Sequence, residues 1–195
     1  MVSATERRRF AAVVVVVILL DQAAKVAAER WLPQYIGMPV LGDVFQLRLV
    51  YNPGAAFGIH VGPYSRWVFM GLSIAALVVL GSMLRATRSG DGVRLQALVL
   101  ICAGAAGNLI DRIRSPRGVV DFLDFTFGSY HFPTFNVADT AVTCGAVLLA
   151  ISLWNEDHPA AATLPARGGG PPQLAAAPPP PRVDQAQSDA PPSVS

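Results

Sequence analysis

The feature that most limits the fold of this chain is a set of four long apolar runs. They cover residues 10–31, 65–84, 95–113 and 136–154. A helix crosses the roughly 30 Å hydrocarbon core of a bilayer with about 20 apolar residues, and each run is close to that length. We therefore expect an α-helical membrane protein with four transmembrane helices and both termini on the same side.

The composition excludes several other classes of protein. Charged residues make up 14% of the 195-residue chain, whereas soluble domains carry about 25%. The net charge of +2, without a basic stripe interleaved with aromatics, predicts no nucleic-acid partner. The two cysteines and three histidines do not have zinc-site spacing, so we expect no metal and no cofactor. Cys102 and Cys144 fall within spans and are expected to pack as small apolar side chains, with the histidines at the surface.

The first apolar run has two interpretations, because a basic segment precedes it as in a cleaved signal peptide. Three further spans would hold the mature chain in the membrane in any case. Asp21 would also place a charge just past the apolar region of a signal peptide, so we expect a retained helix. The arginines divide equally between the two sides of the four spans. Only the cluster of Arg7, Arg8 and Arg9 indicates the orientation, with residues 1–9 as a cytoplasmic segment.

The segments outside the spans differ in character. Residues 32–64 form a long surface loop, in which apolar and polar side chains alternate over residues 45–50 as in a short strand. Asn52, Pro53 and Gly54 then predict a turn. We expect a small extracytoplasmic β-sheet on the membrane surface. Residues 157–195 are rich in Pro and Ala and predict a disordered cytoplasmic tail.

Ionisable groups inside spans are costly and are therefore candidates for function. Asp21 and Lys25 are four residues apart on one helical face, acid before base, which favours an ion pair. A structural pair is the alternative to a functional one, because pairing lowers the pKa of an acid and makes it a poor proton donor.

Two other helix ends carry polar clusters. Asn108, Asp111 and Arg112 share one face of the third span, and small residues precede them at 103–107. Small residues let helix backbones approach closely, so this face and the start of the fourth span can lie side by side.

Asn136 and Asp139 share a face at the start of that fourth span. They have a second interpretation, as an N-cap and an acid favoured by the helix dipole. Asp121 and Asp124 lie in the apolar segment 119–125; they point to opposite faces if it is extended and share one if it is helical.

Five stretches carry a resemblance to a known family. They are residues 21–25 (DQAAK), 52–58 (NPGAAFG), 107–112 (GNLIDR), 119–122 (VVDF) and 135–139 (FNVAD). In this order they resemble lipoprotein signal peptidase, or signal peptidase II, a family of membrane aspartyl proteases. The resemblance spans about residues 10–155 and implies a four-span peptidase domain over residues 10–156.

The resemblance also assigns roles to single residues. It implies that Asp121 and Asp139 are the catalytic pair. It implies that Asn52, Asn108, Arg112 and Asn136 bind substrate or line the site, and that Asp21, Lys25 and Asp111 support the structure. Capping of helix carbonyls or pairing with Asp111 remains an equal alternative for Arg112. Asp124 lies outside the matched positions.

The chemistry explains why two aspartates are needed. At about 4 Å and an effective dielectric near 20, two carboxylates repel by on the order of 4 kcal/mol, or roughly three pKa units. One acid therefore stays protonated while the other serves as base.

The resemblance implies a monomeric enzyme of the bacterial cytoplasmic (inner) membrane, with its active site near the extracytoplasmic face. Its implied partners are membrane lipids and prolipoprotein substrates, cut before a diacylglyceryl-modified cysteine.

The sequence fits three other functions less well. A small transporter would place its acids near the middle of the membrane, whereas here they gather towards one face. A serine or metal intramembrane protease needs a nucleophilic serine motif or H-E-x-x-H, and neither occurs. A scaffold that recruits partners through the tail would need a clear P-x-x-P ligand with flanking charge.

Overall fold

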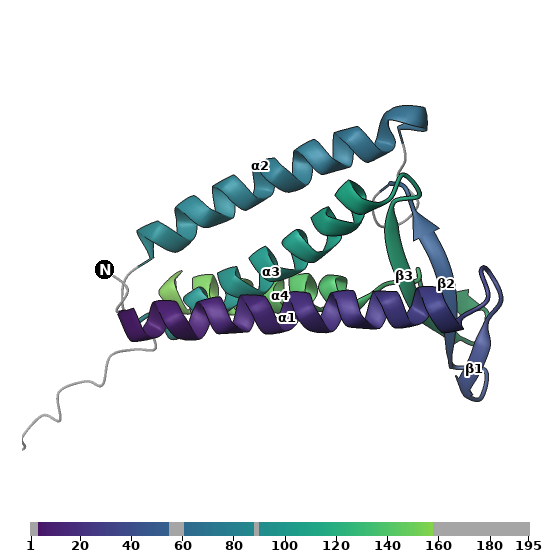
Figure 1. Ribbon diagram of the computed structural model, residues 1–195. Coiled ribbons are helices and arrows are strands. Elements are labelled where there is room, and N and C mark those ends of the chain that lie inside the picture. The colour runs from purple at the N-terminus through teal and green to yellow at the C-terminus, as the bar shows by residue number, and fades with distance from the viewer. Residues whose placement is uncertain (1–3, 55–60, 88–89, 158–195) are drawn as a thin grey trace, which may run out of the picture. The chain divides into compact units, whose positions relative to one another are not determined.

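Four long helices and one small sheet make up the described part of the chain (Figure 1). The structure is a computed structural model, and it describes residues 4–54, 61–87 and 90–157. The helices are α1 (Ala4–Trp31), α2 (Ser65–Ala86), α3 (Gly92–Arg114) and α4 (Val137–Asp157), with a short 3-10 turn, η2 (Gly62–Tyr64), before α2. Each long helix has the length and apolarity to cross a membrane, which confirms the four predicted spans. The residues of the predicted tail from 158 on, with His158, lie outside the described residues, as does His60.

Helix α3 is the central helix, because it packs against α1, α2 and α4. The small residues expected at its contact with α4 do allow a close approach. A Cβ atom on Gly104 would collide with the carbonyl oxygen of Ala138, and one on Gly145 would lie 2.7 Å from the carbonyl oxygen of Ala97. The first turn of α4 is thereby held close against α3.

The sheet is antiparallel in the order β1 (Met38–Leu41), β2 (Phe45–Asn52), β3 (Val119–Phe127) and β4 (Tyr130–His131). Its strands come from the α1–α2 and α3–α4 connections, which lie at the same end of the helices as alternating crossings require (Figure 1). The predicted strand at 45–50 is confirmed and continues to Asn52. The fold class, four helices with a small sheet, is as expected.

Strand β3 decides between the two conformations left open for Asp121 and Asp124. The segment is extended, with Asp121 opposite Val50 and Asp124 opposite Gln46 on β2. Both carboxylates are buried but have different surroundings. Asp124 accepts a hydrogen bond from Gln46 at 3.0 Å, pairs with Arg48 at 3.0 Å and lies 3.1 Å from His131.

A short return segment attaches the start of α4 to β3. Leu123 and Phe135 exchange backbone hydrogen bonds of 2.8 and 3.0 Å. The next residue is Asn136, immediately before α4. This pairing therefore fixes the first turn of α4 next to β3, the strand that contains Asp121.

A buried ion cluster joins the helices beneath the sheet. Lys25 Nζ lies 2.8 Å from both Asp21 and Asp111, and all three side chains are fully buried. Asp21 also accepts the backbone N–H of Ala138 at 2.9 Å, and Asp111 that of Val120 at 3.2 Å. The predicted Asp21–Lys25 pair is confirmed, and with Asp111 it connects α1, α3, α4 and β3.

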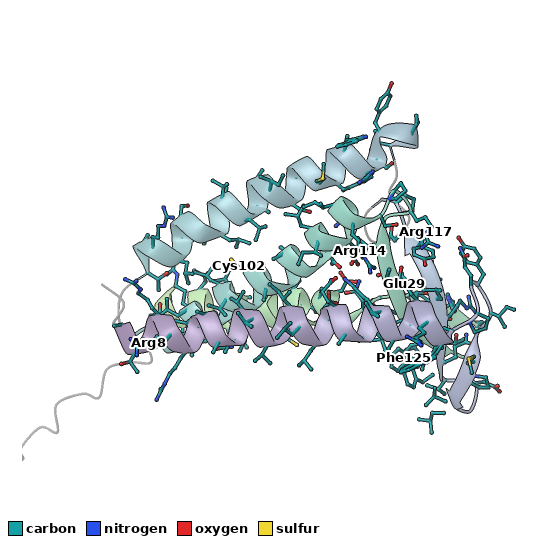
Figure 2. All side chains as sticks on the ribbon, viewed as in Figure 1. Arg8, Glu29, Cys102, Arg114, Arg117 and Phe125 are labelled. Carbon is teal, nitrogen blue, oxygen red and sulfur yellow. The ribbon has the colours of Figure 1, made fainter. Side chains whose placement is uncertain are left out.

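The arginines that follow the third span are held by local partners (Figure 2). Arg114 lies 2.9 Å from Glu29, and Arg117 lies 3.7 Å from it. The guanidinium of Arg117 also covers the ring of Tyr51 at 3.9 Å. A carboxylate on α1 thus partners two of the arginines that made the charge count equal on the two sides.

Candidate active site

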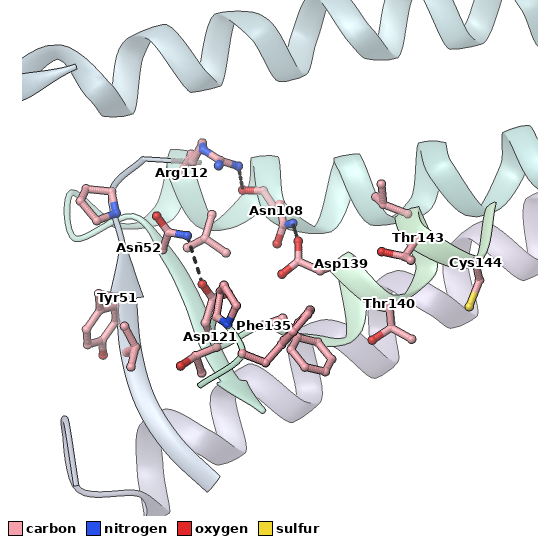
Figure 3. A pocket seen from close by; sticks show the side chains of 17 residues that line it. Tyr51, Asn52, Asn108, Arg112, Asp121, Phe135, Asp139, Thr140, Thr143 and Cys144 are labelled. Carbon is pink, nitrogen blue, oxygen red and sulfur yellow. Dashed lines mark hydrogen bonds between the residues drawn. The ribbon is translucent and has the colours of Figure 1, made fainter. Parts of the chain in front are cut away.

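A cavity of about 690 Å³ opens where the sheet meets α3 and α4 (Figure 3). Asp121 and Asp139 both line it, together with Asn52, Asn108 and Arg112. These residues come from β2, β3, α3 and α4, which are far apart in the sequence. The rest of the wall includes Tyr51, Phe132, Phe135, Thr140, Thr143 and Cys144.

The first turn of α4 holds Asp139 by reciprocal capping. The backbone N–H of Asp139 donates to the Asn136 side-chain oxygen at 2.9 Å, and the backbone N–H of Asn136 donates to Asp139 Oδ2 at 3.2 Å. This is a capping box with aspartate in place of the usual glutamate. The cap expected for Asn136 is therefore present, and it uses only Oδ2 of the two carboxylate oxygens of Asp139.

Asn108 connects the ion cluster to Asp139. Its side-chain oxygen accepts from Lys25 Nζ at 2.9 Å, and its Nδ2 donates to Asp139 Oδ1 at 2.8 Å. An ammonium group can only donate, so Lys25 forces the amide oxygen of Asn108 towards itself and the NH₂ group towards Asp139. Lys25 is thus a support for the site rather than a member of it.

Asn136 makes the corresponding connection to Asp121. Because its oxygen is taken by the N–H of Asp139, its NH₂ group faces the strand. There it donates to Asp121 Oδ1 at 2.7 Å, to the backbone oxygen of Val120 at 3.2 Å and to Asn108 Oδ1 at 3.1 Å. Asn108 and Asn136 together form a bridge of amides between the two carboxylates.

The surroundings of Asp121 favour its protonated form. Burial raises its pKa first, and the nearby charge of Asp139 raises it further. Hydrogen bonds from Asn52 and Asn136 and the charge of Lys25 lower it, and the pKa settles at about 7. Because the charge of Asp139 acts on Asp121, the titration of Asp121 depends on the charge state of Asp139.

The turn after β2 forms another wall of the cavity. Asn52 Nδ2 donates to Asp121 Oδ2 at 3.2 Å, while its oxygen accepts the backbone N–H of Gly54 at 3.0 Å. Residues 55–58 of the corresponding motif lie outside the described residues.

Arg112 caps carbonyl groups, as one of its two alternatives predicted. It donates to the backbone oxygen of Gly54 at 3.0 Å and to that of Asn108 at 3.3 Å. Its buried Nε atom finds no hydrogen-bond partner among the described residues. Arg112 therefore has one donor without a described partner in addition to its contacts with carbonyl groups.

Sequence reasoning missed three features of this region. Gln22 donates to Asp111 at 3.3 Å and to the Gly107 carbonyl at 3.2 Å, although it lies within a matched motif. His131 lies 3.1 Å from Asp124 because the pairing of β4 with β3 brings it there, and this contact has no sequence signal. Cys144 is exposed and lines the cavity, so the expectation that it packs as a small apolar side chain is wrong.

In the part of the chain that the structure describes, no group of three or more His, Cys, Asp or Glu side chains could hold a metal ion.

Comparison with known proteins identifies the family. The family model described as Signal peptidase (SPase) II matches residues 13–155. The chain belongs to the signal peptidase II family. It is 40% identical over 143 residues to the lipoprotein signal peptidase of Geobacter sulfurreducens, which covers 73% of this chain and 89% of that protein. It is 44% identical over 132 residues to that of Burkholderia mallei, covering 66% and 77%.

Two solved structures of bacterial membrane enzymes share the fold of this chain. A bacterial membrane enzyme solved by the in meso method at 2.3 Å resolution has a TM-score of 0.71 and 29% identity, covering 78% of this chain and 91% of its own. A second, at 1.9 Å, has a TM-score of 0.67 and 30% identity, covering 74% and 92%. The family makes this chain a multi-pass membrane peptidase.

Proposed function

We propose that this peptidase removes signal peptides from prolipoproteins, cutting before a diacylglyceryl-modified cysteine, with Asp121 and Asp139 as an aspartic dyad. The observation that carries the proposal is the amide bridge of Asn108 and Asn136. It holds two carboxylates, one from a strand and one from a helix, in the wall of one cavity. That is the arrangement that lets a single pair provide both an acid and a base.

The mechanism follows from a dyad that shares one proton. The ionised carboxyl takes a proton from a water molecule, which attacks the scissile carbonyl carbon, while the protonated carboxyl polarises the carbonyl oxygen. The tetrahedral intermediate then collapses as a carboxyl protonates the departing amine. Because the pKa of Asp121 is raised to about 7, about half of the molecules carry this proton at neutral pH.

The substrate is bound by the residues around the dyad. Arg112 has a buried Nε atom without a described partner, and it lies within the cavity wall. Asn52 stands at the turn that closes the same wall. We assign both to the polar groups of the substrate near the cut. A lipid-modified substrate is concentrated in the bilayer by about 0.8 kcal/mol per buried methylene, so enzyme and substrate meet within one layer.

We assign the site to the extracytoplasmic face of the bacterial inner membrane. Glu29 pairs with Arg114 and Arg117 at the sheet end of the helices, so part of the positive charge there is balanced locally. At the opposite end, Arg7, Arg8 and Arg9 begin α1 and favour a cytoplasmic N-terminus.

The test uses the purified protein in detergent and measures whether it cleaves a lipidated and an unlipidated prolipoprotein. We expect release of the signal peptide from the lipidated form alone, and no release by Asp121→Asn or Asp139→Asn. Asp124→Asn is the matched control, because Asp124 is equally buried on the same strand but faces Arg48 and His131. Normal cleavage by either dyad variant refutes the mechanism. Ion transport by the reconstituted protein without any cleavage refutes the function.

A further inference from the structure

The cavity extends past the dyad along α4. Thr140, Thr143 and Cys144 follow Asp139 on this helix, and all four line the cavity (Figure 3). Since a helix rises about 1.5 Å per residue, Cys144 lies about 7 to 8 Å beyond Asp139 along the axis, away from the sheet. We call Thr140, Thr143 and Cys144 the α4 strip.

The α4 strip differs chemically from the rest of the exposed surface of this helix. Further along α4, the large hydrophobic side chains of Val147, Ile151, Leu153 and Trp154 are exposed. They suit contact with lipid chains. The α4 strip instead carries two hydroxyls and a thiol on small side chains, beside the apolar Val142 in the same wall. All three residues of the strip are exposed, and the Thr140 hydroxyl also donates to the backbone oxygen of Asn136 at 3.0 Å.

Two parts of the substrate could occupy the space beside the α4 strip: the peptide ahead of the cut or the acyl chains. A peptide must be unwound at the scissile bond for the dyad to reach the carbonyl. Unwound backbone at membrane depth leaves N–H and C=O groups that need hydrogen-bonding partners. An acyl chain needs none, so hydroxyl and thiol groups in this wall favour the peptide.

We propose that the α4 strip binds the last residues of the signal peptide, immediately before the cleaved bond. This rests on the function proposed above and adds a location for one side of the substrate. The strip continues directly from Asp139 and runs into the membrane-spanning part of α4, which is the direction in which an apolar signal peptide leaves the cleavage point.

The native thiol of Cys144 provides the test. Alkyl methanethiosulfonates of increasing length convert it to a mixed disulfide, with methanesulfinate as the leaving group. We expect kcat/KM for the lipidated prolipoprotein to fall as the alkyl group lengthens. The largest adduct should reduce it by about 10- to 100-fold, the effect of a small misplacement of bound substrate. Each sample is compared with its own unreacted enzyme, and a reductant should restore the rate.

The matched control is the double variant Cys144→Ala/Val78→Cys. Val78 is 68% exposed on α2, a helix that contributes no residue to the described cavity wall, and Cys102 is present in both proteins. The same reagents should change the rate of this variant by less than about twofold, because a surface substitution away from the site has little effect. Equal inhibition of the two proteins overturns the proposal, as does an unaffected rate when Cys144 carries the longest adduct.

The occupant is identified by varying the substrate. The effect of the adduct should depend on the size of the side chain at the third residue before the cut, and it should not depend on acyl-chain length. Such non-additivity is the sign of groups in contact. Dependence on acyl length instead overturns the assignment to peptide. Failure of the proposed function is a separate result, because the unreacted enzyme then does not cleave at all.

Discussion

Replacing Asp121 by Asn should change how the stability of the protein depends on pH. The Asp121 side chain is only 3% exposed, and burial together with the charge of Asp139 raises its pKa from 3.8 to about 7. The folded protein therefore binds this proton more tightly than the unfolded chain does. The resulting stabilisation is complete below about pH 4 and is lost as the pH rises to about 7.

The size of the effect follows from the shift in pKa. Each unit corresponds to about 1.36 kcal/mol, so the full shift is worth about 4 kcal/mol. Between pH 5 and pH 8 the wild-type protein should lose about 3 kcal/mol of this, since about two units of the shift lie above pH 5. Asn cannot titrate, so the variant lacks this loss. The new side-chain NH₂ group faces the NH₂ group of Asn52, where Asp121 accepted a hydrogen bond. This contact changes the free energy of unfolding by an amount that does not depend on pH.

The assay is thermal unfolding in an uncharged detergent, followed by the fluorescence of the three tryptophans from pH 5 to pH 8. At about 2–4 °C per kcal/mol for a chain of this size, the Tm of Asp121→Asn should gain roughly 6–12 °C on the wild type over this range. Asp43→Asn, which replaces an exposed acid, should show no such trend. A difference between Asp121→Asn and wild type that stays constant with pH, or that shrinks, would refute the reasoning.

Three further predictions test the support of the site. Lys25→Met leaves two fully buried carboxylates without their cation and should cost about 3–5 kcal/mol, measured by thermal unfolding; an unchanged Tm would contradict the structural role. Gly104→Leu should abolish cleavage, because its side chain collides with the Ala138 carbonyl and separates α3 from α4, whereas Gly71→Leu on α2, where a Cβ meets nothing within 4 Å, should cleave normally. Asp124→Asn should lower stability by about 1–3 kcal/mol and still cleave, because it weakens a buried pairing away from the cavity; a stable but inactive Asp124→Asn protein would assign the catalysis to the wrong acid.

Much of the architecture could be predicted because its signals are local. The spans follow from the length of apolar runs, and the Asp21–Lys25 pair follows from a spacing of four on a helix. The capping by Asn136 and Asp139 follows from a spacing of three at a helix start. In each case the helix itself brings the residues together, so the chain order contains the information.

The arrangement of the candidate site depends on contacts that chain order does not contain. Only the packing of α1 against α3 adds Asp111 to Lys25, and only that contact sets which way the Asn108 amide faces. Local pattern left Asp121 and Asp124 as equivalent acids, and the strand conformation of β3 separated them. The exposure of Cys144 in the cavity likewise arises from the wall that other elements build beside α4. Spacing determines which side chains share a face, but the partner of that face is decided by the packing of segments distant in sequence.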